Sequence, residues 1–245
     1  MFLHNKTIVI CVSSKNFKTC FKLQEGNWTI YNSLNYERTF AATVSTNNAT
    51  FIFGGMDSKT KYTFEYLEKD AANWKLGKTN ITGSFEYGCT IAISEEEIWL
   101  IGGLTPNEKR ILSFNVRNQS FTEMPFELKL GRRQHQCAFI PGTRNIIVTG
   151  GTDYGYYLDS TQIINVDNGS VSNGARMNSK RCRHGIGILN INNQERIVIF
   201  GGKNDDDYLK TVEVYNTQAQ NWELSNITLI EARESFGFLT IKSWP

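Results

Sequence analysis

The sequence contains few prolines, few histidines and no long apolar run. Four prolines in 245 residues leave glycine, asparagine and aspartate to form most of the turns. Three histidines limit the metal-binding and proton-transfer chemistry that the chain can support. No stretch approaches the roughly 20 apolar residues that a membrane-spanning helix requires, so we expect no membrane span.

Neither sign of charge dominates. Twenty-six Lys and Arg residues against 24 Asp and Glu residues give a formal net charge of +2, without a basic stripe. Nucleic acid or an anionic membrane surface would call for such a stripe, so we expect neither partner. The first residues, "MFLHNKTIVICVSSKN", become polar too early for a secretory signal. A cytoplasmic location and, if a signal peptide is missing, an extracellular one both stay open.

The five cysteines include no C-x-x-C pair, so a structural zinc site is not expected. Cys11 and Cys20 flank a short turn, and we expect them to face each other across a hairpin. In an oxidising compartment they would form a disulfide. Asn-x-Ser/Thr sequons are in mild excess over chance, which is a weak indication of secretion. They begin at Asn5, Asn27, Asn48, Asn80, Asn118, Asn168 and Asn226.

Four apolar segments end in a pair of glycines at a nearly constant spacing. "TFIFGG", "EIWLIGG", "NIIVTGG" and "RIVIFGG" end 48, 48 and 51 residues apart, at Gly55, Gly103, Gly151 and Gly202. A fixed period of this length indicates a repeat array or a propeller. We expect the glycines where a strand leaves a crowded region and the backbone requires a positive φ.

Other features keep the same phase as the glycines. An alternating apolar segment precedes each pair, and another follows it. A short strand then opens on a bulky residue that we expect to pack between adjacent sheets: Trp74, Phe121, Val171 or Trp222. Each unit is therefore predicted to contain four short strands joined by tight turns.

The two ends of the chain complete a fifth unit. "TIVICVS" aligns with "RIVIFGG", whereas "ESFGFLTIKSWP" matches a first strand that no second strand follows. Pairing them would close a ring and protect its sheet edges. We therefore predict an all-β propeller of four-stranded antiparallel blades in one domain, residues 1–245. The predicted blades are 7–32 plus 234–243 for the split closing blade, then 36–78, 85–125, 133–175 and 183–226.

These residues resemble the kelch repeat. The segment "RIVIFGGKNDDDYLKTVEVYNTQAQNWEL" has the apolar strand, the glycine pair, the aromatic residue and the Trp that follows about seven residues later. The resemblance implies a β-propeller, often with a split closing blade. The first unit lacks its glycines, and Val171 replaces the Trp of the fourth. Five units are fewer than the six usual in the family, so either the ring has five blades or a blade lies outside this sequence.

The repeat phase places polar residues at the start of each first strand. The resemblance implies that such residues, with those after the glycines, contact a partner peptide at the channel mouth. We expect a non-enzymatic adaptor or scaffold that binds a protein or peptide, without cofactor or metal. The alternative is that these residues are solvated loop ends with no binding role. The candidates are Arg38, Thr39, Glu86, Tyr87, Gln134, His135, Arg183, His184, Glu234 and Ser235, then Met56, Asp57, Leu104, Thr152, Asp153, Lys203 and Asn204.

Two other functions stay open. One is an extracellular propeller that binds glycans or matrix, suggested by the sequons and by Cys11 with Cys20. The other is a kelch-like enzyme that modifies a sugar or metabolite, for which Glu86, His135, Arg183 and His184 are the available cluster. The aspartates 205–207 lack the spacing of a calcium loop and are expected to form a solvated turn. "GGTDYGYY" opens no helix, which excludes a nucleotide-binding loop.

Overall fold

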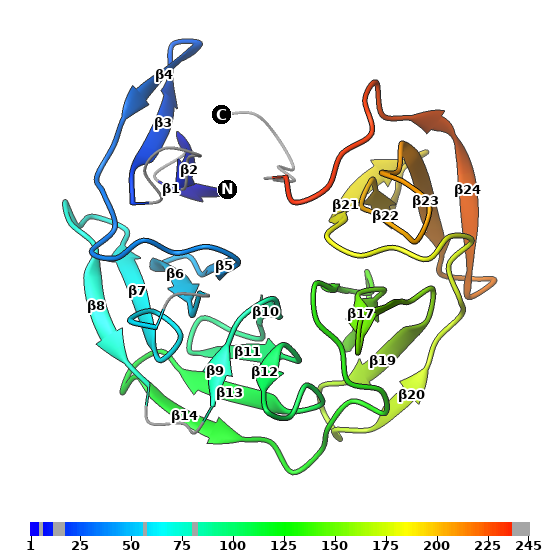
Figure 1. The fold of residues 1–245 in the computed structure, drawn as a ribbon, viewed down its shortest axis with the longest axis horizontal. Helices are drawn as coiled ribbons and strands as arrows, with labels where there is room; N and C mark the ends of the chain where they lie inside the picture. Colours follow the sequence, from blue (N-terminus) through cyan, green and yellow to red (C-terminus); the bar gives the residue numbers. More distant parts are fainter. Residues whose placement is uncertain (5–6, 12–17, 56–57, 80–82, 237–245) are drawn as a thin grey trace. The chain divides into compact units, whose positions relative to one another are not determined.

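All regular structure in the described part of the chain is β-strand. A computed structural model describes residues 1–4, 7–11, 18–55, 58–79 and 83–236 (Figure 1). These residues form five four-stranded antiparallel sheets and contain no helix. The predicted fold class, an all-β propeller of four-stranded blades, is confirmed. The chain divides into two compact units, residues 1–124 and 125–244. That residues 1–245 act as one domain stays a prediction.

Three sheets make up the first unit. In each sheet the strands are hydrogen-bonded in the order in which they follow along the chain. The sheets are β1 (Phe2–His4), β2 (Thr7–Cys11), β3 (Cys20–Gln24) and β4 (Asn27–Ile30); β5 (Ala42–Ser45), β6 (Ala49–Phe53), β7 (Thr63–Glu68) and β8 (Lys75–Lys78); and β10 (Cys89–Ala92), β11 (Glu97–Ile101), β13 (Ile111–Asn115) and β14 (Ser120–Glu123). The short strands β9 (Ser84–Phe85) and β12 (Leu104–Thr105) pair separately.

The second unit contains two further sheets and one small hairpin. The sheets are β15 (Gln136–Phe139), β16 (Asn145–Thr149), β19 (Thr161–Asn165) and β20 (Val171–Asn173); and β21 (Gly185–Ile191), β22 (Gln194–Phe200), β23 (Thr211–Asn216) and β24 (Asn221–Thr228). The hairpin is β17 (Thr152–Asp153) with β18 (Tyr156–Tyr157).

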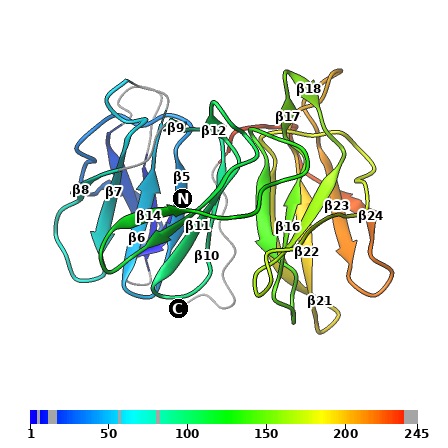
Figure 2. The ribbon, with the colours of Figure 1, turned by 90° about the horizontal axis from the view of Figure 1, so that it is seen from below.

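Each sheet has two different ends, which we call the turn end and the glycine end. The turn end carries the tight turns that join the first strand to the second and the third to the fourth. In the four sheets that begin with β5, β10, β15 and β21, the glycine end carries the connection into the first strand and the link between the second and third strands, where the glycine pairs lie. Figure 2 shows the hairpin of β17 and β18 beyond the glycine end of the second unit.

The glycine pairs lie where backbones approach most closely. All eight of their glycines have positive φ. A Cβ on Gly54 would stand 1.7 Å from the carbonyl oxygen of Phe85, at the start of the next sheet. The N–H of Gly55 donates to that same oxygen at 3.2 Å, and the N–H of Gly202 donates likewise to Arg233 at 2.8 Å. The prediction that glycine relieves backbone crowding and supplies a positive φ is confirmed.

The apolar core lies between neighbouring sheets of each unit. In the first unit, packed phenylalanines from the second and third sheets dominate it, including Phe53, Phe64 and Phe114, with ring centroids 5.0 to 5.5 Å apart. In the second unit, isoleucines surround Tyr215 and Trp222, which face each other across β23 and β24. Rings at these separations add attraction beyond the area that they bury.

The predicted bulky residues are buried in three of the four sheets. Trp74, Phe121 and Trp222 are at most 7 % exposed, whereas Val171 is only half-buried. The first sheet departs from the seven-residue pattern. Trp28 of its fourth strand lies opposite Leu23 and is 48 % exposed, so this tryptophan is not buried as Trp74 and Trp222 are.

The first sheet also takes its first strand from the N-terminal end of the chain. We expected the C-terminal segment 234–243 beside β2, but β1 occupies this place, with Phe2 opposite Val9. Phe2 is 4 % exposed and packs edge-on against Trp74, with ring centroids 5.8 Å apart. The burial of Phe2 stabilises β1 as the first strand of this sheet. The sequence of this sheet has no glycine pair, so the pattern did not predict this strand. Residues 237–243 of the expected strand lie outside the described residues.

The predicted disulfide between Cys11 and Cys20 is present. The two cysteines lie directly opposite each other in the register of β2 and β3, and their sulfur atoms are bonded. The bond closes a hairpin of nine residues' separation, which limits the conformations open to the unfolded chain.

Candidate functional site at the glycine ends

A buried arginine holds the glycine end of three sheets together. Arg38 donates from Nη1 to the carbonyl oxygens of Gly54 (2.6 Å) and Thr63 (3.1 Å), which end the second strand and begin the third. All three arginines are 0 % exposed. The equivalent bonds run from Arg132 to Gly150 and Ser160, and from Arg181 to Gly201 and Thr211.

Two of these arginines form ion pairs with a buried glutamate of the third strand. Arg38 Nε lies 2.9 Å from Glu65, and Arg181 Nη2 lies 2.6 Å from Glu213. Glu213 also accepts the backbone N–H of Asn178 at 2.7 Å, and thereby holds the segment that enters the sheet. Burial lowers the pKa of both arginines, and the glutamates oppose this effect. A fully hydrogen-bonded pair is the form in which buried charges are tolerated.

The fourth sheet replaces this glutamate with Gln162. Its Oε1 accepts the N–H of Lys129 at 2.7 Å, so the entering segment is still held. Arg132 forms no ion pair within the described residues. Burial lowers the pKa of Arg132 to about 10, although the charge of Asp153 acts in the opposite direction.

A second repeated feature is a residue with left-handed backbone, which lies two positions before β5, β10, β15 and β21; Ser235 has the same backbone conformation. The φ angles at these positions lie between 52° and 58°. Backbone hydrogen bonds connect the positions in neighbouring sheets of one unit: Tyr87 N–H to Phe40 (3.1 Å) in the first, and Arg183 N–H to Gln134 (2.8 Å) in the second. We call them the left-handed residues: Phe40, Tyr87, Gln134, Arg183 and Ser235.

These residues correct the alignment of the predicted site. Arg38 is equivalent to Arg132 and Arg181 rather than to Arg183, because it lies two positions before a left-handed residue. Its guanidinium is fully buried and fully engaged in the sheet, so it offers nothing to a partner. His135 and His184 follow the left-handed residues and are 1 % and 2 % exposed. These three of the ten candidates are therefore buried side chains and do not reach the surface of the unit.

The two histidines fill the space behind the glycine pairs. A Cβ on Gly151 or on Gly202 would stand 2.9 Å from the Cβ of His135 or His184, respectively. His184 Nε2 lies 2.8 Å from the hydroxyl of Thr149. Burial, followed by the charge of Arg181, lowers the pKa of His184 well below its ordinary value. Its imidazole is therefore neutral at physiological pH and serves packing, which weakens the enzymatic alternative.

The other seven candidates reach the surface in their own units. In the first unit Thr39, Glu86 and Tyr87 are half-buried, and Tyr87 stacks on Phe40 with ring centroids 4.3 Å apart. Phe40, missed by the sequence analysis, is 39 % exposed. In the second unit Arg183 lies 3.0 Å from Glu234, with 31 % and 17 % of their side chains exposed. Gln134 is half-buried and Ser235 is exposed.

The segments after the glycine pairs extend the surface of the second unit. The backbone of Thr152 forms a β-bridge with Arg133 and pairs with Tyr157 in the hairpin. The backbone of Lys203 forms β-bridges with both Cys182 and Tyr208. Asp153 and Asn204 are half-buried. Of the remaining candidates, Met56 and Asp57 lie outside the described residues, and Leu104 lies in β12.

Three exposed tyrosines lie on these segments, and the sequence analysis did not single them out. Tyr154 is 94 %, Tyr156 76 % and Tyr208 48 % exposed. Lys203 Nζ stands over the Tyr208 ring at 5.3 Å from its centroid. Both segments extend beyond the glycine end of the second unit (Figure 2). We call Tyr154, Tyr156 and Tyr208 the tyrosine surface; its signal was the tyrosine-rich "TDYGYY" directly after a glycine pair.

Tyr154 occupies a position where local chemistry favours another residue. It forms a two-residue hairpin turn with Gly155, and their φ angles are 46° and 90°. Such a type I′ turn favours Asn at its first position, because Asn tolerates the left-handed conformation better than other non-glycine residues. A bulky ring in a strained and exposed position is a common sign of a functional contact.

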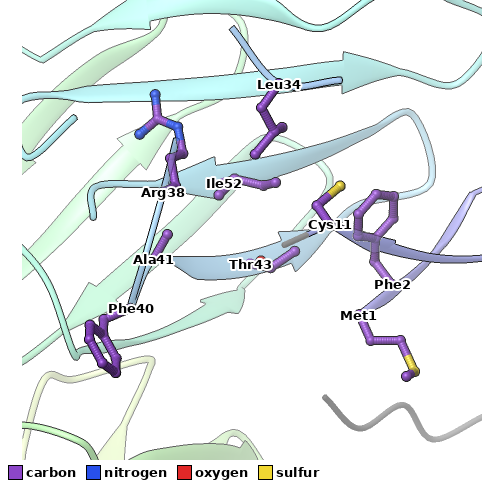
Figure 3. Close-up of a pocket in the computed structure, with 9 residues that line it drawn as sticks. All are labelled: Met1, Phe2, Cys11, Leu34, Arg38, Phe40, Ala41, Thr43 and Ile52. Atoms are coloured by element: carbon purple, nitrogen blue, oxygen red, sulfur yellow. The ribbon is translucent and has the colours of Figure 1, made fainter. Parts of the chain in front are cut away.

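The first unit contains a small cavity with both polar and apolar walls. It has a volume of about 150 Å³ between β1 and β5, with walls that include Phe2, Leu34 and Ile52 (Figure 3). Arg38 lines it too, but its guanidinium is engaged with Glu65. Sites for drug-sized ligands start at about 300 Å³. The cavity therefore gives no support to a metabolite-modifying enzyme.

The acidic turn after the last glycine pair is held by local contacts. Asn204 Oδ1 accepts the N–H groups of Asp206 and Asp207 at 2.9 Å, and Asp205 pairs with Lys180 at 3.2 Å. Among the described residues, no three His, Cys, Asp or Glu side chains are grouped as metal ligands would be. Within the same residues, we find no helix of the length and apolarity that a bilayer crossing needs.

The buried thiol of Cys182 is expected to make the fold less stable at alkaline pH. The thiol is free and 1 % exposed, and burial raises its pKa from 9.0 to about 11. Because the folded state keeps the proton that the unfolded state loses, stability falls as pH rises from about 9 through 11. We expect the wild type to lose more than about 1 kcal/mol relative to Cys182→Ala between pH 7.5 and pH 10. Urea unfolding of both proteins measures this difference; parallel pH profiles would contradict it.

Comparison with protein families identifies a known repeat motif in the second unit. Residues 181–225 fit the model of the Kelch motif, and they span the last Arg–Gly-Gly unit from Arg181 into β24. A search of curated proteins found no match to this chain. The matched segment contains the buried Arg181–Glu213 pair, Gly201 and Gly202, and the Tyr215–Trp222 contact. The repeat assignment made from the sequence therefore agrees with both the motif and the sheets.

Proposed function

We propose that the chain is a propeller of the kelch type and a non-enzymatic scaffold that binds a protein or peptide at the glycine end of its second unit; the Kelch motif matched at residues 181–225 supports this. Kelch propellers are commonly protein-binding scaffolds and generally not enzymes. The observation that carries the proposal is the tyrosine surface. Three tyrosines stand exposed on two backbone segments that are fixed by cross-strand bridges.

The chemistry of this surface suits a protein partner. Tyrosine supplies a large contact area with little loss of side-chain entropy, and it is enriched among the residues that dominate binding energies. The half-exposed pair of Arg183 and Glu234 offers one charge of each sign. A partner segment that combines apolar side chains with polar groups of both signs would match it. Of the original candidates, Gln134, Arg183, Glu234 and Ser235 remain part of this proposed surface.

The glycan- or matrix-binding alternative draws its support from the Cys11–Cys20 disulfide, which indicates an oxidising compartment. This observation concerns the location of the protein more than its ligand. We therefore favour a protein partner and leave glycans as a competing ligand in the test.

Replacing Tyr154 by Asn separates binding from folding. Asn suits the left-handed turn position, so we expect the variant to be as stable as the wild type or about 1 kcal/mol more stable. The same change removes a ring that is 94 % exposed. We expect affinity for a bound peptide to fall at least tenfold, which corresponds to about 1.4 kcal/mol.

The probe is a peptide selected on the full-length chain from a displayed random library, with its affinity measured by calorimetry. Tyr156→Ser should weaken binding as Tyr154→Asn does. Leu189→Ser, at a residue 44 % exposed near the turn end of β21, serves as the matched control and should bind like the wild type. Equal affinities for all four proteins, or selection of glycans but no peptide, would overturn the proposal.

A further inference from the structure

Most of the sequons within the described residues lie at one end of the sheets. Five of the seven fall within the described residues, at Asn27, Asn48, Asn118, Asn168 and Asn226. The first four lie in or directly after the tight turns of the turn end, in four different sheets. The fifth lies in the edge strand β24. Among the described residues, no sequon lies in the connections of the glycine end, where the tyrosine surface is.

The asparagines of the third and fourth sheets are held in the same local geometry. Asn118 Oδ1 accepts the N–H of Ser120 at 3.1 Å and its hydroxyl at 2.6 Å. Asn168 Oδ1 accepts the N–H of Ser170 at 2.9 Å. Both asparagines are exposed, and within the described residues neither Nδ2 donates a hydrogen bond to the protein. In both turns the carboxamide oxygen is engaged with the sequon serine, while the nitrogen faces solvent.

Both turns form from contacts close in sequence. Asn115 Oδ1 accepts the N–H groups of Arg117 and Asn118, and Asn165 Oδ1 accepts that of Asn168. Such Asx turns need no distant part of the fold. The geometry around each sequon is therefore available to a chain that has not completed folding.

The disulfide provides an independent observation. A bond between Cys11 and Cys20 persists in the oxidising compartments of the secretory route and outside the cell. Attachment of N-linked glycans to Asn-x-Ser/Thr acceptors belongs to secreted proteins as well. The exposed sequons and the disulfide are thus both typical of a protein that enters the secretory pathway.

We propose that Asn118 and Asn168 carry N-linked glycans, so that the turn end of the sheets is the glycosylated end. The donor is a lipid-linked oligosaccharide pyrophosphate. Nδ2 forms a bond to the anomeric carbon of the sugar while the bond from that carbon to the phosphate oxygen breaks. The lipid pyrophosphate leaves, and Nδ2 loses one proton. The glycans then stand at the end of each sheet away from the glycine pair.

The experiment is site-resolved peptide mapping of the protein purified from its native source. Treatment with a peptide N-glycosidase in ¹⁸O-water converts each glycosylated Asn into a labelled Asp. We expect label that depends on the enzyme at Asn118 and Asn168, and none at Asn190, an exposed asparagine of β21 outside any sequon. Incubation in ¹⁸O-water without the enzyme measures the spontaneous deamidation of Asn168, which precedes a glycine. Unlabelled peptides covering both Asn118 and Asn168 would overturn the proposal.

Variants of the full chain, made in cells that secrete it, test the two sites separately. Ser120→Ala and Ser170→Ala keep each asparagine but remove its sequon, and each should abolish one glycan-dependent shift in electrophoretic mobility. Asn190→Gln is the matched control and should migrate like the wild type. A wild type whose mobility the glycosidase leaves unchanged contradicts the proposal. These readouts do not involve peptide binding, so they are independent of the function proposed above.

Discussion

Replacing Gly54 by Ala is expected to abolish stable folding of the first unit or to lower its free energy of unfolding by more than about 4 kcal/mol. Two costs combine at this position. The φ of +68° costs a non-glycine residue about 1–2 kcal/mol. The added methyl group would also stand 1.7 Å from the carbonyl oxygen of Phe85, which is backbone and accepts the N–H of Gly55. Relief of the contact therefore requires the two sheets to separate. Urea unfolding and soluble yield measure the effect.

Gly26→Ala is the matched control in the same unit. Gly26 has nearly the same backbone conformation, with a φ of +79°, but no atom lies within 4 Å of an added Cβ. We expect this control to lose only about 1–2 kcal/mol, from backbone strain alone. If both variants lost the same stability, close packing at the glycine pair would not be the reason for the repeated glycines.

Replacing Glu213 by Ala is expected to cost about 3–5 kcal/mol. The change leaves the guanidinium of Arg181 buried without its carboxylate, and breaking a buried ion pair on one side carries a penalty of this size. It also removes the acceptor for the backbone N–H groups of Asn178 and Ser179. The segment that enters the last sheet would then lose its attachment. Chemical unfolding, followed by the fluorescence of Trp222, reports the loss.

Glu213→Gln provides the comparison, because the fourth sheet already has a glutamine at the equivalent position. Gln162 accepts two backbone N–H groups, and nearby Arg132 forms no ion pair among the residues that the structure describes. We therefore expect Glu213→Gln to retain the attachment and to lose clearly less stability than Glu213→Ala. Equal losses for the two variants would mean that the charge of Glu213, rather than its hydrogen bonds, secures the segment.

The repeat pattern predicted the sheets because the same requirement for glycine, set by close backbone approach, recurs at a nearly constant spacing along the chain. Close backbone approach demands glycine at Gly54, Gly150 and Gly201, and no other residue type substitutes there without strain. The alternating apolar segments around them predict the strands. The N-terminal strand β1 could not be predicted in this way, since its sheet lacks the glycine pair and its burial depends on Trp74, far along the chain.

The candidate site was predicted less well because the hairpins differ in length. The buried arginine precedes the first glycine by 16 residues in the second sheet, by 18 in the fourth and by 20 in the fifth. Each added residue pair lengthens the hairpin between the first two strands. Alignment by residue type matched Arg38 with Arg183, although its counterpart is Arg181. The φ values that distinguish them are not visible in the sequence.

The left-handed residues share a backbone role but have five unrelated side chains. Phe40, Tyr87, Gln134, Arg183 and Ser235 all adopt the same backbone conformation, and a backbone N–H to C=O hydrogen bond joins Tyr87 to Phe40, Arg183 to Gln134 and Ser235 to Arg183. The joint between sheets thus places no demand on side-chain chemistry at these positions. Substitutions there can alter what the surface recognises while the joint persists. After a repeat is duplicated, a single substitution at such a position could therefore change what the surface binds without destabilising the fold.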